Sequence, residues 1–187
     1  MAPSLVRVSR FLSLVLRHDP GRVGLTLDEG GWVSVDDLVA ASRQTGVPLD
    51  RATLEEVVAE NDKRRFALSA DGARIRANQG HSVPVDLGLE PLEPPATLYH
   101  GTAARAVPSI LERGIHAGQR VYVHLSADEQ TAEAVGRRHG QPVVLHVAAG
   151  RMHREGHPFF RSENGVWLTA AVPARYLACP DCERSGS

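Results

Sequence analysis

Leu98-Tyr99-His100-Gly101-Thr102 opens the second half of the chain, directly after a proline-rich stretch. Its apolar and aromatic start is typical of a short β-strand, and Gly101 predicts a sharp turn at the end of that strand. Because glycine has no Cβ, the backbone there can approach a ligand closely. The histidine and the threonine on either side add hydrogen-bonding groups. The stretch therefore predicts a turn that binds a polar, flat ligand, and a plain surface turn with one histidine is the competing interpretation.

The surrounding sequence favours the ligand site. In the stretch VYVHLS, strict alternation places the aliphatic residues toward a core and His124 and Ser126 toward the opposite face. His100 and His124 are then both near strand ends, and each is followed two residues later by a hydroxyl side chain. Between them, Gly114 and Ile115 can offer backbone groups and an apolar surface to a planar base.

The rest of the second half predicts an α+β arrangement. Helices are expected around Val107 and Ile110 and after a capping box that starts at Ser126. Strands are expected at residues 142–147 and 166–169. No Gly-x-Gly-x-x-Gly pattern opens a helix, so a dinucleotide is not expected to bind in the Rossmann way, and no metal-ligand spacing is convincing.

The composition is that of a globular protein with largely aliphatic cores. The chain has 187 residues, of which 42% are hydrophobic, 23% charged and 5% aromatic, and its net charge is −1. That charge leaves only local clusters to bind a polyanion. No apolar run can span a bilayer and no signal-peptide core is present, so we expect a cytoplasmic protein without a membrane segment. Cys179 and Cys182 match only half of a zinc-binding pattern and the sequence holds no second pair, so we expect two ordinary thiols in a frayed tail.

The first half opens with an amphipathic helix. Apolar residues recur at helical spacing between residues 5 and 15, and Pro20 ends the helix near Arg17 and His18. The helix dipole favours cations at that end. The pair is a common cap unless other cations converge on it.

A small basic sheet is expected next. Residues 24–27 predict a short strand, and Ser34 and Asp50 are expected to cap two further helices. An Asp-Gly turn then separates two alternating runs, 65–69 and 73–77, which is the signature of a hairpin. Its polar face carries Arg65, Arg74 and Arg76. Three helices and a basic hairpin resemble a winged-helix module, although a solvated outer face has the same pattern.

The segment between the halves loses periodicity and holds four prolines. We therefore predict a first lobe at residues 1–80, a stiffened linker at 81–96, a second lobe at 97–180 and a tail at 181–187.

Five blocks, in order along the chain, resemble the RNA 2′-phosphotransferase family. They are residues 11–18 (FLSLVLRH), 61–66 (NDKRRF), 79–82 (QGHS), 136–140 (GRRHG) and 163–169 (ENGVWLT). The strand ends His-Gly-Thr and His-Leu-Ser also resemble the NAD pocket of the ADP-ribosyltransferase-like fold. The resemblance implies a winged-helix lobe that binds RNA, followed by an ADP-ribosyltransferase-like lobe with a split β-sheet that binds NAD+.

The family removes an internal 2′-phosphate from RNA and uses NAD+ as the phosphate acceptor. The resemblance therefore implies NAD+ and a tRNA-like RNA as substrates, with no metal. It assigns NAD binding to His100, Gly101, Thr102, Gly114, Ile115, His124 and Ser126. It assigns catalysis to Arg17, His18, Arg65 and Arg138. In this set Arg65 fits better than Arg64 because it adjoins Phe66, and Arg138 fits better than Arg137 because it precedes His139.

These residue types suit the chemistry. A phosphate is already ionised at neutral pH, so its attack needs no general base, and Glu163 is assigned no catalytic role. Arginine binds phosphoryl oxygens through two parallel hydrogen bonds. His18 has the pKa range of a proton donor to the leaving oxygen.

Two other functions remain open. The chain can ADP-ribosylate terminal nucleic-acid phosphates and stop after the first step, or it can be a non-catalytic winged-helix nucleic-acid binder. Absence of some of the four candidate catalytic residues would favour the first alternative, but all four are present. Loss of His100 or of the His124 turn would favour the second alternative, and neither is lost. Without an exposed heptad or a large apolar stripe, we expect a monomer.

Overall fold

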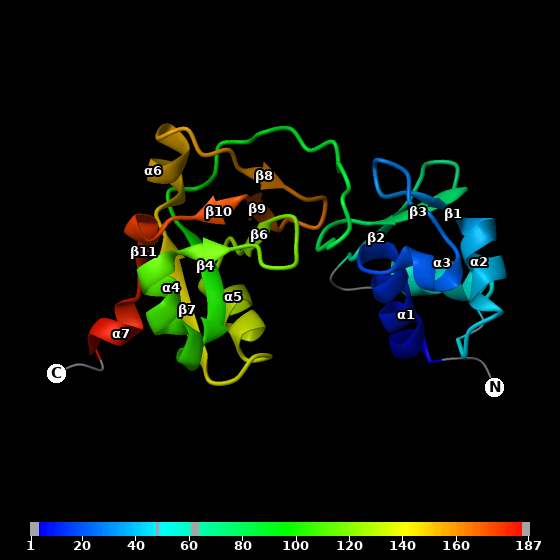
Figure 1. Cartoon of the computed structure of the whole chain (residues 1–187), viewed down its shortest axis with the longest axis horizontal. Helices are drawn as coiled ribbons and strands as arrows, with labels where there is room; N and C mark the ends of the chain where they lie inside the picture. The colour runs from blue at the N-terminus through cyan, green and yellow to red at the C-terminus, as the bar shows by residue number, and fades with distance from the viewer. Residues whose placement is uncertain (1–3, 48, 61–63, 185–187) are drawn as a thin grey trace. The chain divides into compact units, whose positions relative to one another are not determined.

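The computed structural model describes residues 4–47, 49–60 and 64–184. The chain divides into two compact units, Met1–Gly88 and Leu89–Ser187, here called unit 1 and unit 2 (Figure 1). Each combines helices with small antiparallel sheets, so the fold class is α+β. The boundary between the units falls inside the segment 81–96.

Unit 1 consists, in its described residues, of helices around a three-stranded sheet of order β1-β3-β2. Its elements are α1 (Leu5–Arg17), the 3₁₀ turn η1 (Pro20–Val23), β1 (Val33–Ser34), α2 (Val35–Ser42), α3 (Arg51–Ala59), β2 (Phe66–Leu68) and β3 (Arg74–Ala77). The apolar stripe of α1 is buried in the core, as predicted, and His18 is the C-cap of this helix. Ser34 and Asp50 cap α2 and α3, as predicted, by accepting backbone hydrogen bonds from Asp37 and Thr53.

The hairpin is also confirmed. Phe66 and Ile75 are buried on one face of β2 and β3, while Arg74 and Arg76 are on the other. The predicted strand at residues 24–27 is wrong. Gly24 adopts a left-handed φ of 70° and ends η1, which leaves the following residues as an irregular segment, and β1 instead supplies the third strand of the sheet.

Unit 2 is built around the pairing of β4 with β7, and β11 extends the sheet on the other side of β7. Further antiparallel pairs join β5 to β10 and arrange β6, β9 and β8 in that order. The elements are β4 (Leu98–Ala103), η2 (Ala104–Ala106), α4 (Val107–Arg113), β5 (Ile115–His116), β6 (Val123–Leu125), α5 (Glu129–Gly136), β7 (Pro142–Val147), α6 (Ala149–Arg154), β8 (Phe160–Arg161), β9 (Trp167–Thr169), β10 (Ala171–Val172), η3 (Ala174–Tyr176), β11 (Leu177–Ala178) and α7 (Pro180–Arg184).

The predicted turn at Gly101 is wrong, because β4 runs straight through this residue to Ala103. Helix α5 packs on β4 at this point (Figure 1). A Cβ at Gly101 would lie 1.6 Å from the carbonyl oxygen of Ala132, and a Cβ at Gly136 would lie 2.8 Å from the carbonyl oxygen of Thr102. The two glycines thus allow helix and strand backbones to touch, a contact that we call the glycine seam.

Two further sequence expectations need correction. Ser126 does not cap α5; Asp128 does so by accepting hydrogen bonds from the backbone N–H and the hydroxyl of Thr131. Cys179 and Cys182 are joined by a disulfide, and Cys179 is buried beside Leu145, so they are not thiols of a frayed tail. Along the described ranges, none of the helices has both the length and the apolar character that crossing a membrane requires.

Candidate functional site

The C-terminal end of α1 receives a second segment of unit 1, residues 79–82. The backbone N–H of Ser82 donates to the carbonyl oxygen of Arg17 at 2.8 Å, and the Ser82 hydroxyl lies 3.0 Å from Nδ1 of His18. Two of the blocks singled out in the sequence, 11–18 and 79–82, are therefore in direct contact.

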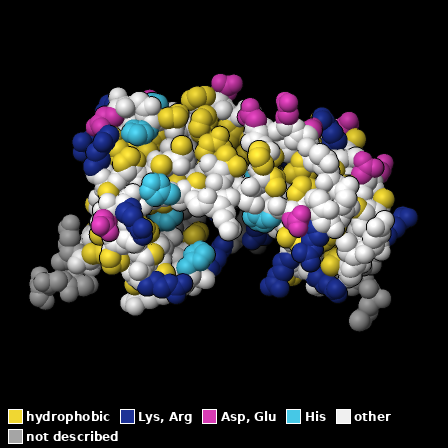
Figure 2. Space-filling view, viewed as in Figure 1, with side chains coloured by type: hydrophobic (Ala, Val, Ile, Leu, Met, Phe, Trp, Pro, Cys, Tyr) yellow, Lys and Arg dark blue, Asp and Glu magenta, His cyan; other side chains and the backbone are white. Residues whose placement is uncertain are grey.

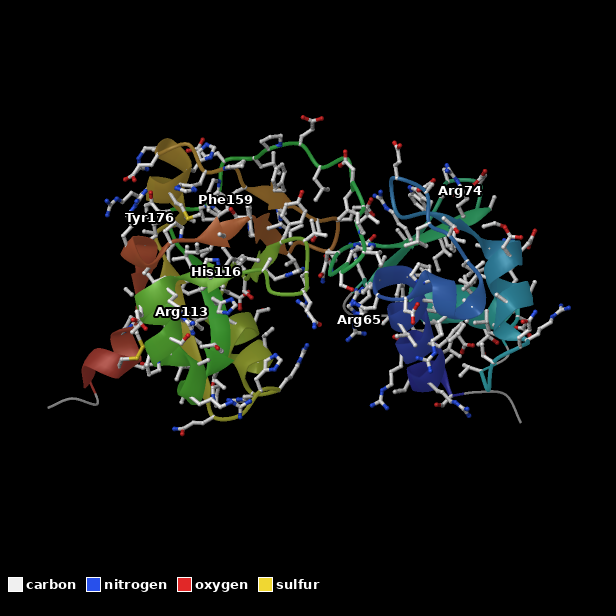
Figure 3. The ribbon with its side chains drawn as sticks, in the orientation of Figure 1. Arg65, Arg74, Arg113, His116, Phe159 and Tyr176 are labelled. Carbon is white, nitrogen blue, oxygen red and sulfur yellow. A yellow bond between two sulfur atoms is a disulfide. The ribbon has the colours of Figure 1, made fainter. Side chains whose placement is uncertain are left out.

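A third block reaches the same place. The guanidinium of Arg17 lies over the ring of Phe66, 5.8 Å from its centroid. Arg65 comes directly before this phenylalanine, and its carbonyl oxygen accepts from the N–H of Asn78, the residue that precedes the 79–82 block. Figure 3 shows Arg65 on the side of unit 1 where α1 lies. Arg17, His18 and Arg65 thus belong to one neighbourhood of unit 1, here called the α1 end cluster.

His81 is the buried member of that neighbourhood. It is 3% exposed, and its pKa is lowered from 6.5 to about 4, first by burial and then by the positive charges of Arg17, His18 and Arg76. The imidazole is therefore neutral at pH 7. Because three basic side chains lower the pKa of His81, positive charge is concentrated at this end of α1. Figure 2 shows a group of Lys and Arg side chains over the region of α1.

The predicted ligand residues of unit 2 also come together. Tyr99 and Ser126 form a two-way backbone bridge between β4 and the end of β6, with N···O distances of 2.9 and 2.8 Å. Nδ1 of His100 lies 3.2 Å from the carbonyl oxygen of His124. The side chains of His124 and Ser126 are on the less buried face of β6, as the alternation predicts, but the prediction is wrong for Val121, which precedes the strand and is 39% exposed.

This geometry fixes the state of His100. Burial lowers its pKa, the hydrogen bond to the His124 carbonyl partly opposes that, and the charge of His139 adds to the lowering. The ring is therefore neutral at pH 7. A carbonyl oxygen only accepts, so Nδ1 carries the hydrogen, and Nε2 is the acceptor nitrogen of the ring.

Packing accounts for four of the other predicted ligand residues. Gly101 makes room for α5, and Thr102 beside it is 8% exposed. A Cβ at Gly114 would lie 2.4 Å from the carbonyl oxygen of Val172, and Ile115 is 5% exposed in the core of unit 2. Any contact of Gly114 and Ile115 with an adenine stays a prediction, because their positions are already explained by the fold.

The two candidate arginines after α5 differ in their surroundings. Arg137 forms an ion pair with Glu133 at 2.7 Å, whereas Arg138 is exposed and makes no ion pair with a described residue. The choice of Arg138 as the phosphate-binding residue stays a prediction. Arg138 belongs to unit 2, and Arg17, His18 and Arg65 belong to unit 1.

Sequence reasoning missed the contacts of His81 and Ser82. Their block, QGHS, was noticed as a resemblance and given no role, because a contact across 64 positions leaves no local signal. Residues 61–63 of the NDKRRF block lie outside the described residues. Within the described ranges, His, Cys, Asp and Glu side chains form no group of three suited to a metal ion.

Comparison with known proteins identifies the relatives of this chain. Residues 3–171 match the model of a family described as RNA 2'-phosphotransferase, Tpt1 / KptA family. A probable RNA 2'-phosphotransferase of Agrobacterium fabrum is 59% identical over 169 residues, which cover 90% of this chain and 91% of the relative. Proteins of the same name from Burkholderia lata and Rhodopirellula baltica are 57% and 56% identical over 177 residues, covering 94% of this chain and 91% and 96% of the relatives.

Proposed function

The chain belongs to the RNA 2'-phosphotransferase, Tpt1 / KptA family, and from that premise we propose that it transfers an internal 2′-phosphate from RNA to NAD+. The observation that carries the proposal is the α1 end cluster, in which separate sequence blocks bring Arg17, His18 and Arg65 to one neighbourhood. Such a set suits a phosphate: arginines bind its oxygens in pairs, and histidine exchanges a proton near neutral pH.

The groups of unit 2 support NAD+ as the second substrate. Neutral His100 offers Nε2 as an acceptor for a ribose hydroxyl, and Ser126 adds a hydroxyl across the bridge from Tyr99. NAD+ supplies an electrophilic ribose carbon: the RNA phosphate displaces nicotinamide from it, giving an ADP-ribosylated RNA 2′-phosphate. The neighbouring 2″-hydroxyl then attacks phosphorus, so that 2′-OH RNA and ADP-ribose 1″,2″-cyclic phosphate are released.

The residues of the chain have separate tasks in this proposal. Arg17, Arg65 and Arg138 orient the RNA phosphate and stabilise the negative charge that spreads over its oxygens. His18 donates a proton from Nε2 to the 2′-oxygen as RNA leaves. No residue has to deprotonate the attacking phosphate, because it is ionised at neutral pH.

We also infer that unit 1 is a winged-helix lobe that binds RNA and that unit 2 is an ADP-ribosyltransferase-like lobe. Support for the former is the order of three helices and a hairpin, with Arg74 and Arg76 lying 5.5 and 4.6 Å from the centroid of the Trp32 ring. A tRNA-like substrate and a monomeric enzyme remain part of the proposal.

The test is a product analysis. A short RNA with one internal 2′-phosphate is incubated with the protein, with and without NAD+, and the products are identified by mass. We expect NAD+-dependent loss of the phosphate together with ADP-ribose cyclic phosphate. An RNA with a terminal phosphate is the comparison substrate. A stable ADP-ribosylated RNA, or RNA binding without reaction, contradicts the proposal in favour of one of the two other functions.

A further inference from the structure

The contact between Ser82 and His18 has a specific geometry. The Ser82 hydroxyl lies 3.0 Å from Nδ1 of His18 and 3.5 Å from the carbonyl oxygen of Arg17, and the Ser82 N–H donates to that same carbonyl at 2.8 Å. The carbonyl is at the end of α1, where helix carbonyls need partners from outside the helix. The backbone of Ser82 is therefore anchored independently of its side chain.

We propose that Ser82 is a positioning residue for His18, which it orients through Nδ1 so that Nε2 is the nitrogen that exchanges a proton with RNA. This inference rests on the proposed function, in which His18 is the proton donor. A hydroxyl both donates and accepts. Protonated His18 carries a hydrogen on both ring nitrogens, so its Nδ1–H donates to the Ser82 oxygen at 3.0 Å, and the Ser82 hydrogen is left for the Arg17 carbonyl oxygen at 3.5 Å.

The consequence is a fixed tautomer. In protonated His18, the N–H at Nδ1 donates to the Ser82 oxygen. When Nε2 gives its proton to the leaving 2′-oxygen, the hydrogen on Nδ1 stays in the same bond, and the ring keeps its orientation. His18 is exposed, so a ligand can reach it. Without the Ser82 hydroxyl, this hydrogen bond no longer selects Nδ1 as the nitrogen that carries the hydrogen of the neutral ring.

Two neighbours of His18 have other states or partners. His81 is neutral, because burial and the charges of Arg17, His18 and Arg76 lower its pKa to about 4, so it does not exchange protons near pH 7. Asp19, the next residue in the chain, accepts a hydrogen bond from the backbone N–H of Arg22.

The experiment compares Ser82→Ala with Ser82→Thr, which keeps a hydroxyl, and with Ser9→Ala on α1 as a matched control. The ring nitrogens of His18 are observed by two-dimensional nitrogen–proton NMR across a pH titration, and steady-state kinetics are measured on the same proteins. We expect the Nδ1–H tautomer in the wild type and in Ser82→Thr, and a shift toward Nε2–H in Ser82→Ala. In Ser82→Ala we expect kcat to fall about tenfold, since general acid catalysis contributes about 10²–10⁴-fold, with KM little changed.

The pH profile gives a readout that loss of folding alone does not produce. The limb of the kcat profile that follows His18 moves in Ser82→Ala and returns in Ser82→Thr. An unchanged His18 tautomer in Ser82→Ala overturns the inference, as does equal loss of activity in the alanine and threonine variants with unshifted profiles. If the wild type leaves the RNA phosphate in place, the proposed function fails, and the His18 tautomer alone then decides whether Ser82 orients the ring.

Discussion

In unit 1, the candidate residues are held by contacts between segments that are far apart in the sequence, whereas in unit 2 the candidates lie on or directly beside paired strands. Arg17 and His18 are contacted by Ser82 and Phe66, which come from other segments. His100 and Ser126, by contrast, are fixed by the bridge between β4 and β6 and by α5 packed on β4. We therefore expect substitutions at the candidate residues of unit 1 to change activity without unfolding that unit, and substitutions at the glycine seam of unit 2 to destabilise the fold as well.

The strongest test of this difference is Gly101→Ala. The added Cβ meets the Ala132 carbonyl, and neither backbone can yield without opening the glycine seam. We expect unit 2 to lose about 3 kcal/mol of stability or more, which is a large part of the ~5–15 kcal/mol that typically separates a folded domain from its unfolded chain. Amide spectra should show the loss in unit 2 while unit 1 resonances persist. The control is Gly118→Ala, where nothing lies within 4 Å and only the positive φ of 63° is strained. A Gly101→Ala protein as stable as the wild type contradicts the close backbone contact at the glycine seam.

In unit 1, Arg65→Ala should separate activity from folding. Removal of one group that stabilises developing charge typically lowers kcat by about 10²–10³, and we expect that loss without a change in the amide spectrum of unit 1. Arg64→Ala is the matched control. The Asn78 side chain donates to the backbone carbonyl oxygen of Arg64, and the substitution keeps this hydrogen bond. Full activity of Arg65→Ala on 2′-phosphorylated RNA removes Arg65 from the mechanism.

The stability of unit 1 should depend on pH through His81. Its pKa is about 4 in the folded state against 6.5 unfolded, so between these values the unfolded chain binds a proton that the folded chain does not. The contribution of His81 to the free energy of unfolding is fully present above pH 6.5. It decreases as the pH falls toward 4, by at most about 3 kcal/mol. Urea unfolding of wild type and His81→Gln across this range measures it. The variant should have a flatter profile, while His116→Gln, a change at an exposed position of unit 2 labelled in Figure 3, should leave unit 1 unaffected.

The smallest effect is expected from helix caps, one in each unit. Ser34→Ala removes the acceptor for the Asp37 N–H in α2, and Asp128→Ala removes the acceptor for Thr131 in α5. Each loss costs about 1 kcal/mol. Hydrogen exchange should place the change in unit 1 for the first variant and in unit 2 for the second. If either variant changes the hydrogen exchange of both units equally, the expectation that each cap stabilises only its own unit is wrong.

Local patterns explain which parts of the fold were predictable. The stripe of α1, the caps of α2 and α3 and the alternation in β2, β3 and β6 depend on residues a few positions apart, and all of these were predicted. The strand expected at 24–27 failed because a left-handed Gly24 ends η1, and β1 was missed because its partner lies about forty residues further on.

The candidate site shows the same limit. The arginines, His18 and the two histidines of unit 2 were predicted as site residues from short blocks whose residue types suit the chemistry, and they stay predictions. Ser82 and His81 were not given a role, because their contacts with α1 appear only when the chain is folded. Gly101 was assigned to ligand approach, whereas the backbone of α5 occupies that space.

The glycine seam also acts as a spacer. Gly136 ends α5, and Arg138 follows two positions later, while His100 comes directly before Gly101 on β4. One backbone contact therefore sets the separation between the chain positions of a phosphate-binding candidate and an NAD-binding candidate. A side chain added at this contact would push α5 away from β4 and so increase the distance between Arg138 and His100 without contacting either residue. The close approach that two glycines allow between helix and strand thus sets the spacing of two candidate residues in unit 2.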